Sequence, residues 1–480
     1  MLLSDFLFLD RFTRESASRT GSSLKAAFKH LQNPDVISLG GGLPPSDYFP
    51  LSTISLTVPS LASLTQDAAN PTANPHATLQ STKHDLSTSL SPYDLTTALN
   101  YCQSNGAAPL LRWLTEHTEL LHNPPYADWA CTATIGNTSA LDMALRMFAR
   151  RGDAVLADAY TFSTAVETAA PMGVRFVGVE MDEQGMVPGS LRRVLETWDE
   201  AGTGTPRPFL LYTVPTGQNP TGVTQGVERR REIYRVAQEW DLIVLEDDPY
   251  YFLQLEPYAG GEDGSAAGPP RPPEELLERL VPSYLSMDTD GRVVRMDSFS
   301  KVVFPGARVG WITASQQIVE QYKHHADVST QGPAGLSQLV LFKLLDEHWG
   351  HEGYLNWLLH IRSEYTKRRD FTIDACERYL PAGIVSWKPA QAGMFQWLKV
   401  DCSSHPHIKS KTAAEIEEEI WLESIKRGAL VARGSWFRVP DDRPHLDVYF
   451  RITFAAASLD KIAEAVRRFG NAVDEFFHVK

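Results

Sequence analysis

The sequence predicts an α/β fold, in which a mainly parallel sheet lies between helices and a smaller α+β domain follows. Short runs rich in Val, Ile and Leu alternate with amphipathic segments over residues 138–314. Near-continuous apolar strands separated by helices are typical of parallel sheets covered on both faces. Polar clusters follow three of these runs, and open sheets of this type bind ligands beyond the carboxyl ends of their strands.

Six strand-like runs carry this prediction. In chain order they are residues 154–158, 175–182, 209–215, 242–248, 293–299 and 309–314. Segments with helical periodicity, such as 138–153 and 227–241, fall between several of them. After residue 345 the chain changes to a long helical stretch and then to strand-like runs at 393–400 and 447–455. We therefore expect a large domain in 101–345 and a small α+β domain in 346–480.

The first 100 residues are predicted to form an arm and a loop-rich segment that contributes to the small domain. The apolar run at the start of the chain is interrupted by Asp5 and Asp10, which favours a packed arm over a secretion signal. Residues 51–92 are rich in Ser, Thr, Pro and Asn and predict a long irregular surface loop. A second loop is expected from Tyr258 to Glu275.

The composition argues against several classes of partner. The 480 residues carry a formal net charge of −14, whereas proteins that bind nucleic acids usually show a basic surface. The 4 cysteines are widely scattered without the spacing of a metal site, which favours reduced thiols in a cytoplasmic protein. No window of the sequence approaches the apolar length of a membrane span. We expect no nucleic acid, membrane or metal partner.

A lysine in a mostly apolar stretch is the first candidate for chemistry. Lys301 follows the run 293–299, with Ser298 and Ser300 before it and Arg308 seven positions after it. Burial lowers the pKa of a lysine, so that more of it is the free amine that forms Schiff bases with aldehydes. Hydroxyl and guanidinium donors are suited to hold a phosphate. An ordinary surface lysine is the simpler interpretation of Lys301 alone, but its neighbours favour an aldehyde that carries a phosphate.

Two further polar clusters follow strand-like runs. Asp247 lies near the end of the run 242–248, three residues before Tyr250, and a buried carboxylate needs a cation such as a protonated pyridine nitrogen. Asn219 lies in the loop TGQNPTG, where its side chain could bond a phenolate oxygen of a cofactor ring. Each motif alone is also compatible with an ordinary turn. Their positions after apolar strands favour a binding site.

A glycine turn opens the helix predicted from residue 138. Backbone N–H groups of Gly136, Asn137 and Thr138, together with the helix dipole, could bind a phosphate. Helix capping by Asn137 or Thr138 would explain the same residues and is compatible with that role. Tyr160 ends the next strand and could stack on a flat ring, although a core or surface tyrosine is an alternative.

The order of these motifs resembles that of the fold-type I pyridoxal-phosphate aminotransferases. The motifs are GNT, Tyr160, NPTG, DxxY, SxSK and a following arginine. The likeness is to the fungal aromatic and 2-aminoadipate type, related to kynurenine/aminoadipate aminotransferase. It extends from VISLGGGLPPSDYFP to YFRITFAAAS. The resemblance implies a seven-stranded type of sheet, pyridoxal 5′-phosphate as the cofactor, and a homodimer with shared active sites.

The resemblance also implies roles for the residues around the cofactor ring. Lys301 resembles the lysine that forms the Schiff base, and Asp247 resembles the partner of the pyridine nitrogen. Tyr250 and Asn219 match the pair that bonds the ring hydroxyl. Tyr160 matches the stacking aromatic residue.

Further roles are implied at the phosphate and the substrate. Tyr101 is similar to the tyrosine that reaches the phosphate of the neighbouring subunit, and Arg451 looks like the arginine that clamps the substrate α-carboxylate. The residues implied to hold the phosphate are Gly136, Asn137, Thr138, Ser298, Ser300 and Arg308. The further residues implied to contact the substrate are Asn219, Arg19 and Gly41.

The implied activity is transfer of the amino group of an aromatic or 2-aminoadipate-like L-amino acid to 2-oxoglutarate, with ping-pong kinetics. Lys301 would move the proton as general base and acid. A lyase or decarboxylase on the same scaffold is one alternative, because pocket geometry decides which bond breaks. A non-enzymatic regulator related to aminotransferases is another. Such regulators carry a DNA-binding module ahead of the cofactor domain, whereas here the resemblance starts almost at once, near Ile37, and the chain is acidic, so we disfavour this alternative.

Overall fold

The computed structural model describes most of the 480 residues. The described residues are 8–27, 30, 33, 35–37, 39–40, 42–60, 76–258, 260, 273–441 and 447–477. Gly41, a predicted substrate residue, and most of the expected loop 258–275 lie outside them.

The large sheet has seven strands in the order β3-β11-β10-β9-β8-β4-β5. Neighbouring strands β9 and β10 are parallel, as are β4 and β5, and β4 and β8. Strand β11 runs antiparallel to β10 and β3. The sheet is therefore mixed but mostly parallel, and the predicted fold class is confirmed. The strand bounds are β3 Trp129–Thr134, β4 Ala154–Asp158, β5 Arg175–Val179, β8 Leu210–Thr213, β9 Ile243–Asp247, β10 Val293–Ser298 and β11 Gly310–Ser315.

The central strands form because their residues can be buried on both faces. Every residue of β4, β9 and β10 is buried, as parallel strands between helices require. Each of these strands nevertheless ends in a polar residue, which is Asp158, Asp247 or Ser298. The sheet thus presents polar side chains at the carboxyl ends of its strands, where the sequence predicts the site.

The chain divides into two compact units, which we describe separately. Unit 1 comprises Met1–Arg151, Ile243–Pro249 and Pro270–His360, and unit 2 comprises Gly152–Leu242, Tyr250–Pro269 and Ile361–Lys480. The division predicted from the sequence, with boundaries near residues 100 and 345, stays a prediction.

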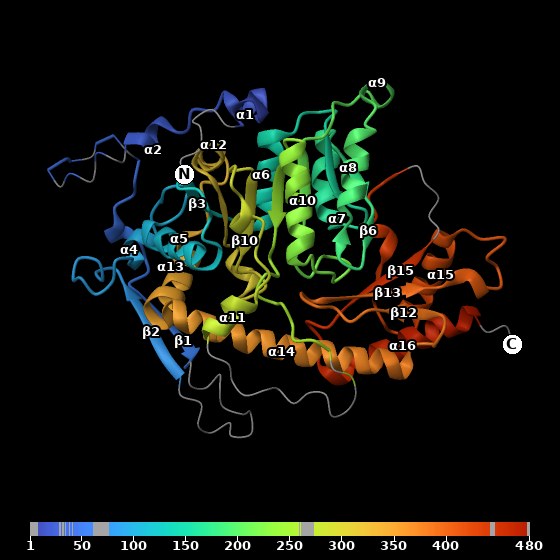
Figure 1. The fold of residues 1–480 in the computed structure, drawn as a ribbon. Coiled ribbons are helices and arrows are strands. Elements are labelled where there is room, and N and C mark those ends of the chain that lie inside the picture. Colours follow the sequence, from blue (N-terminus) through green and yellow to red (C-terminus); the bar gives the residue numbers. More distant parts are fainter. Residues whose placement is uncertain are drawn as a thin grey trace. The chain divides into compact units, whose positions relative to one another are not determined.

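Unit 1 contains the helices that pack on β3, β10 and β11 (Figure 1). They are α5 (Ala108–His122), α6 (Asn137–Phe148) and α12 (Gln316–Asp327). The N-terminal segment packs on α6, since Phe12 is buried and its ring stacks on Phe148 with centroids 5.2 Å apart. Within the apolar run predicted to pack, Phe8 and Phe12 are buried, and the residues before Phe8 lie outside the described ones. The other helices of unit 1 are α1 Arg14–Ala17, α2 Ser23–Ala27, α4 Leu95–Ala98, α11 Pro273–Arg279 and α13 Gly335–Phe342, with a π-helical segment at Lys343–Trp349.

The prediction of an irregular loop throughout residues 51–92 is wrong. Strand β1 (Thr53–Pro59) pairs with β2 (His76–Thr82) in an antiparallel ribbon, with Leu56 opposite Leu79. Half-buried and exposed residues alternate along β1, which is the period of a strand with one covered face. The Ser, Thr and Pro content indicated a loop, but the alternation of Ile54, Leu56 and Val58 with Ser and Thr was the stronger signal.

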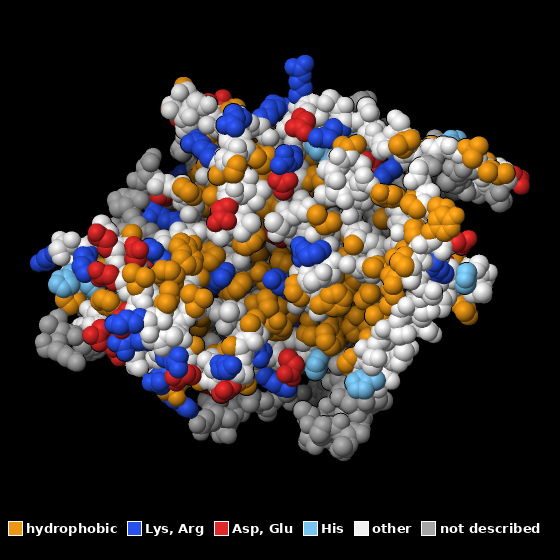
Figure 2. Space-filling view, turned by 180° about the vertical axis from the view of Figure 1, so that it is seen from behind, with side chains coloured by type: hydrophobic (Ala, Val, Ile, Leu, Met, Phe, Trp, Pro, Cys, Tyr) orange, Lys and Arg blue, Asp and Glu red, His pale blue; other side chains and the backbone are white. Residues whose placement is uncertain are grey.

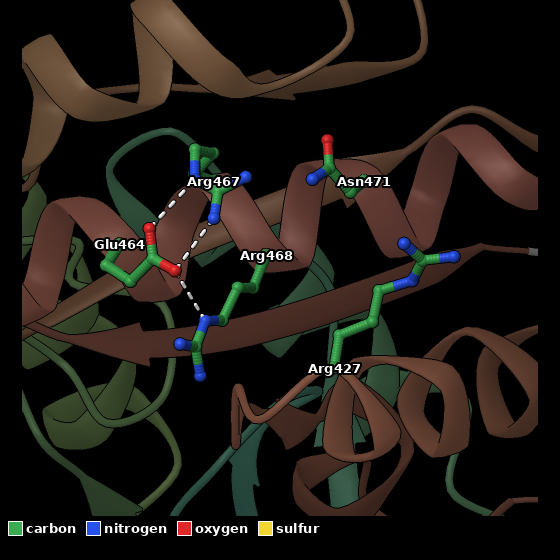
Figure 3. A pocket seen from close by; sticks show the side chains of 5 residues that line it. All are labelled: Arg427, Glu464, Arg467, Arg468 and Asn471. Carbon is green, nitrogen blue, oxygen red and sulfur yellow. Dashed lines mark hydrogen bonds and ion pairs between the residues drawn. The ribbon is translucent and has the colours of Figure 1, made fainter.

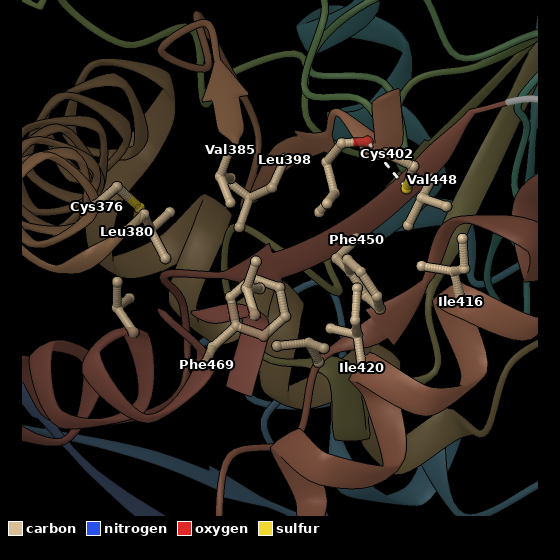
Figure 4. Packing of buried hydrophobic residues seen from close by; sticks show 14 of the residues in the cluster. Cys376, Leu380, Val385, Leu398, Cys402, Ile416, Ile420, Val448, Phe450 and Phe469 are labelled. Carbon is tan, nitrogen blue, oxygen red and sulfur yellow. Dashed lines mark hydrogen bonds between the residues drawn. The ribbon is translucent and has the colours of Figure 1, made fainter. Parts of the chain in front are cut away.

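Unit 2 contains a second, four-stranded sheet with the order β12-β13-β15-β14, all antiparallel. One of its faces packs under α15 and α16, where Leu398 and Phe450 meet Ile420 and Phe469 (Figure 4). The alternate residues of β13 and β15, including Phe395 and Arg451, consequently point to the opposite face. The bounds are β12 Val385–Trp387, β13 Phe395–Val400, β14 Ala432–Arg433, β15 Val448–Thr453, α15 Ala413–Lys426 and α16 Leu459–Phe477.

The remaining helices of unit 2 accompany strands β4, β5 and β8. Helices α8 and α10 lie side by side (Figure 1). Helix α14 (Gly350–Tyr379) begins in unit 1 and ends in unit 2. Across the described residues, none of the helices combines the length and apolarity needed to cross a membrane. The other bounds in unit 2 are α7 Ser163–Ala169, α8 Pro188–Glu196, α9 Glu200–Thr203 and α10 Val227–Glu239, with short strands β6 Met181–Asp182 and β7 Gly185–Met186.

Candidate functional site

Asp247, the last residue of β9, is a buried carboxylate oriented by an amide. Its Oδ1 accepts a hydrogen bond from Asn137 Nδ2 at 2.8 Å, and the same nitrogen donates to the carbonyl of Met296 at 2.9 Å. Asn137 is a neutral donor, so it fixes the carboxylate without cancelling its charge. The phosphate role predicted for Asn137 then rests on its backbone N–H at the start of α6, because its side chain serves Asp247.

Donor groups gather between the N-terminus of α6 and the segment after β10. Arg308 Nη1 donates to Ser300 Oγ at 3.3 Å, and Ser298 Oγ lies 2.9 Å from Ser300 Oγ. The other contacts of Arg308 are the carbonyls of Ile135 and Pro305. Within the described part of the chain, no carboxylate neutralises this guanidinium. A cation, two hydroxyls and a helix N-terminus suit a doubly charged phosphate.

Gly136 leaves room for that arginine. Its φ is +100°, and a Cβ built on it would lie 2.4 Å from Arg308 Nη2. Glycine is therefore required both by the backbone conformation and by the guanidinium that lies against it. Thr138, the second residue of α6, is exposed.

Lys301 lies in the turn that follows β10. It is half-buried, between buried Val302 and the donor Ser300. The turn closes through Val303 N, which donates to the carbonyl of Phe299 at 2.9 Å. The sequence-predicted lysine and phosphate donors are thus brought together in unit 1.

A buried charge cluster lies on β9 and β10, on the residues that alternate with Asp247. Arg295 is fully buried, and its guanidinium contacts Glu246 at 2.9 Å, Asp248 at 3.3 Å and Asp297 at 2.8 Å. Burial raises the pKa of Asp297 to about 6, and the Arg295 charge offsets part of that rise. Sequence reasoning missed this cluster, although charged residues inside the apolar runs LIVLEDD and VVRMDSF were a signal for it.

Arg451 on β15 is the cation that contacts several of the predicted site residues of unit 2 and their aromatic neighbours. Its Nη1 donates to Asn219 Oδ1 at 2.7 Å, and its guanidinium carbon lies 4.2 Å from the ring centroid of Phe395 and 4.6 Å from that of Phe437. Burial lowers the pKa of Arg451. No carboxylate of the described residues contacts it. The geometry leaves a half-buried cation between two rings, which an anionic group can neutralise.

The loop that carries Asn219 is held by close backbone packing. Gly217 has a φ of +52°, and a Cβ there would meet the backbone of Ala392 and Gly393 at 2.5–2.6 Å. Gln218 Nε2 donates to the carbonyl of Tyr160 at 2.5 Å. Fully buried Arg230 donates to Thr216 Oγ1 at 2.8 Å. Sequence reasoning also missed the bracing role of Arg230, which lies inside an otherwise ordinary charged helix.

Two tyrosines predicted at the cofactor also lie in unit 2. The Tyr160 ring meets Trp397 edge-on at 5.5 Å and Tyr449 at 5.3 Å, and burial raises its pKa. Tyr250 is buried and lies edge-on to Phe395 at 5.9 Å. Unit 2 therefore brings Tyr160, Tyr250 and Arg451 onto one aromatic surface of the small sheet.

Two predicted residues lie apart from these groups. Tyr101, in unit 1, is 66% exposed. Arg19 Nη2 donates to Glu15 Oε1 at 2.6 Å, so a carboxylate of the preceding helix α1 already holds it. Their predicted roles stay predictions.

A surface pocket of about 360 Å³ lies elsewhere in unit 2, lined by Arg427, Glu464, Arg467, Arg468 and Asn471 (Figure 3). Glu464 holds Arg467 and Arg468, and Arg427 bonds Glu423 and Glu475. These charges balance, and α16 covers the face of the small sheet opposite Arg451. The pocket is therefore lined by ion pairs that are in contact with solvent.

The described residues contain no group of three or more His, Cys, Asp or Glu side chains placed to hold a metal ion.

The sequence and the fold of this chain are similar to those of known proteins. The model of the family "Aminotransferase class I and II" matches residues 100–469. An aromatic amino acid aminotransferase of Schizosaccharomyces pombe is 44% identical over 96% of this chain and 97% of its own length. The L-tyrosine:2-oxoglutarate aminotransferase of Serpula lacrymans is 33% identical over 97% of this chain and 95% of its own length. The crystal structure of aminotransferase Aro8 from Candida albicans superposes with a TM-score of 0.91 at 37% identity and covers 99% of each chain.

Proposed function

Because this chain belongs to the class I and II aminotransferases, which work with pyridoxal 5′-phosphate, we propose that it moves the amino group of an aromatic L-amino acid to 2-oxoglutarate. The family and the cofactor are those that the ordered motifs predicted. An aromatic donor and a 2-oxoglutarate acceptor appear in the names of the similar S. pombe and S. lacrymans enzymes. Both substrates carry an α-carboxylate.

The observation that carries the proposal is the environment of Arg451. Its guanidinium is partly buried, lies between two phenylalanine rings, and has a neutral amide oxygen as its hydrogen-bond partner. A substrate α-carboxylate would supply the missing negative charge. Phe395, Trp397 and Tyr160 provide apolar and aromatic surface on the same side of the small sheet, which favours an aromatic donor side chain.

The residues of unit 1 fit the cofactor. Ser298, Ser300, Arg308 and the N-terminus of α6 form a donor cradle for its phosphate, and buried Asp247 suits a protonated ring nitrogen. When bound, pyridoxal phosphate supplies an aldehyde carbon and an electron-accepting ring.

Each of the chain's own site residues would then have a separate role. Lys301 would bind the cofactor aldehyde and move the proton that leaves the substrate Cα, as general base and then as general acid. Asp247 would hold a proton on the ring nitrogen, with Asn137 orienting its carboxylate. Tyr250 and Asn219 would bond the ring oxygen. Tyr160 would stack on the ring, and Arg451 would orient the substrate through its carboxylate.

We also propose a homodimer, in which Tyr101 reaches the phosphate of the partner subunit. Large apolar side chains are exposed in the N-terminal part of unit 1, among them Ile37 at 87%, Leu39 at 96% and Tyr48 at 82%. Hydrophobic side chains gather on one face in the space-filling view (Figure 2). Apolar side chains that are this exposed in one chain are expected to be buried against a second protein surface. Light scattering should give twice the 53.4 kDa mass of the chain, and a monomer at micromolar concentration would contradict the dimer.

The cytoplasm is the proposed compartment. The described cysteines, Cys102, Cys131, Cys376 and Cys402, form no disulfides, which suits a reducing environment. Cell fractionation with an organelle marker tests this, and recovery in an organelle fraction would contradict it.

A donor panel tests the reaction. Purified enzyme with pyridoxal phosphate is given 2-oxoglutarate and, in turn, phenylalanine, tyrosine, tryptophan, kynurenine, 2-aminoadipate, leucine or methionine. We expect one glutamate per donor consumed, and the highest kcat/KM with an aromatic donor. Release of ammonia or carbon dioxide instead of glutamate would favour a lyase or a decarboxylase.

Lys301→Ala provides the matching test of the residue. This variant should lose turnover while it still binds the cofactor through its phosphate. Borohydride reduction should fix the cofactor on the peptide that contains Lys301 in the parent enzyme and not in the variant. Near-normal turnover by Lys301→Ala would overturn the assignment.

A further inference from the structure

The turn that carries Lys301 is anchored on both sides of the lysine. Two residues before it, Phe299 is fully buried, and one residue after it, Val302 is 3% exposed. Phe299 N donates to the carbonyl of Val309 at 3.2 Å, which ties the start of the turn to the strand that follows it. Lys301 itself is half-buried.

An aromatic pocket holds the first anchor. The Phe299 ring lies 5.1 Å from Trp311, 6.3 Å from Trp113 and 6.4 Å from Tyr354, measured between ring centroids. These rings come from β11, α5 and α14, so three separate elements fix the residue. Such packing leaves Phe299 a single position.

A directed hydrogen bond holds the second anchor. The indole Nε1 of Trp357, on the unit 1 part of α14, donates to the carbonyl of Val302 at 2.6 Å. Trp357 is in turn stacked on Trp349, with centroids 5.4 Å apart and planes inclined by 19°. The indole N–H thus points at the backbone of the residue next to the lysine, and the contact with Trp349 is one of ring packing.

We propose that Trp357 is a positioning residue for Lys301, which fixes the backbone from which the lysine side chain swings. The inference rests on the role of Lys301 proposed above. A lysine that both binds the cofactor aldehyde and moves a proton must place one nitrogen at two positions in turn. Misplacing a reacting group by about 1 Å can cost about 100-fold in rate, so a fixed backbone origin matters more here than at an ordinary turn.

The chain offers a matched control for this test. Trp349 belongs to the same aromatic stack, but its buried indole nitrogen has no hydrogen-bond partner among the described residues. Trp357→Phe removes the N–H donor and part of the ring. Trp349→Phe removes a comparable ring from the same cluster without touching the Val302 carbonyl. Any effect that both variants share therefore belongs to packing.

The experiment compares the two holoenzyme variants with the parent. The measurements are kcat, KM for the amino donor, the kinetic isotope effect with an α-deuterated donor, the pH titration of the cofactor absorbance, and the melting temperature. For Trp357→Phe we expect kcat to fall about 10-fold or more, with KM within about 2-fold, a larger isotope effect, and a shifted absorbance titration. For Trp349→Phe we expect kcat and the titration to match the parent.

A second replacement keeps the proposal open to refutation if Trp357→Phe folds poorly. β-(3-Benzothienyl)alanine at position 357 preserves the shape of the side chain and exchanges the indole N–H for sulfur. It should reproduce the loss of kcat and the shifted titration with a parent-like melting temperature. Parent-like kcat with this analogue would overturn the role of Trp357.

The same assays separate this inference from the proposed function. Equal effects of Trp357→Phe and Trp349→Phe, with Lys301→Ala inactive, would refute the positioning role and leave the transaminase assignment standing. Turnover by Lys301→Ala would instead remove the premise on which both depend.

Discussion

Arg451 donates a hydrogen bond to the side-chain oxygen of Asn219, 2.7 Å away, although 232 residues separate the two in the sequence. The resemblance gave Arg451 the substrate carboxylate, and it gave Asn219 both the ring hydroxyl and a contact with the substrate. Their contact means that the residue proposed to bind substrate and one proposed to bind cofactor orient each other. A change at Arg451 should therefore act mainly on substrate affinity while also loosening Asn219.

The first prediction concerns the charge of Arg451. Arg451→Gln should raise KM for the amino donor by about 10- to 100-fold, because a charge-assisted hydrogen bond contributes about 1.5–3 kcal/mol. Arg451→Lys should recover only part of this, since an ammonium cannot bind a carboxylate through two parallel N–H groups. Steady-state kinetics measure both. Equal KM values for Arg451→Gln and the parent would show that the carboxylate binds elsewhere.

The second prediction concerns Glu417 of α15, which supports the segment that places Phe437 over Arg451. Glu417 is fully buried and accepts hydrogen bonds from Arg433 Nε at 3.0 Å, from Ser435 N at 3.0 Å, and from the Ser435 hydroxyl. The carbonyl of Phe437 then accepts from Thr161 N at 2.8 Å. Glu417→Gln should raise KM for the donor several-fold, with a smaller change in kcat, and should lower the melting temperature.

Glu418→Gln is the control for that variant. Glu418 is 55% exposed and lies 3.9 Å from the same arginine, so removing its charge should leave KM and the melting temperature near parent values. If Glu417→Gln lowered the melting temperature and left KM unchanged, Glu417 would support the small sheet without influencing Arg451.

Much of the candidate site was predictable because buried parallel strands are recognisable in the sequence as short, uniformly apolar runs. The runs that became β4, β9 and β10 are uniformly apolar, so the polar residues at their ends, such as Asp247, stand out. Helix α6 was likewise predictable from its 3.6-residue periodicity and the glycine before it. The ordered motifs then predicted the family, which the comparisons bear out.

Contacts between distant residues could not be predicted in the same way. Neither the pairing of Asn137 with Asp247 nor that of Asn219 with Arg451 leaves a periodic signal, because each depends on the finished packing. Strands β1 and β2 were missed because we gave more weight to the Ser, Thr and Pro content of residues 51–92 than to the alternation of apolar and polar residues along β1.

The third prediction is a pH dependence of stability that comes from Asp158. This carboxyl at the end of β4 is fully buried, and burial raises its pKa from 3.8 to about 7, although a hydrogen bond from Thr213 offsets part of the rise. The folded protein binds this proton more tightly than the unfolded chain does. The contribution of Asp158 to stability is thus complete below pH 3.8 and is lost as the pH rises through 7.

Asp158→Asn should therefore gain stability relative to the parent as the pH rises. The difference in the free energy of unfolding should change by about 1.4 kcal/mol per pH unit across this window, and should level off above it. Denaturant titrations between pH 5 and pH 8 measure it. In Asp182→Asn the slope should be absent, because the hydrogen bond from Arg229 lowers the pKa of Asp182 and keeps it ionised over this range. A flat difference for Asp158→Asn would show that its carboxyl is ionised throughout.

The fourth prediction separates backbone strain from ligand chemistry at Gly136. An added Cβ would lie 2.4 Å from Arg308 Nη2, and because that atom ends a flexible side chain, the guanidinium can turn away without unfolding the protein. Gly136→Ala should therefore weaken the binding of pyridoxal phosphate by about 10-fold or more, since the phosphate loses a charge-assisted partner.

Gly152→Ala is the control: Gly152 also has a positive φ, at +95°, but a Cβ added there would meet no atom within 4 Å. Both variants should lose about 1–3 kcal/mol of stability through strain, whereas only Gly136→Ala should lose cofactor affinity, measured by titrating the apoenzyme and following the absorbance of the bound cofactor. Equal cofactor affinity in the two variants would mean that Arg308 does not bind the phosphate.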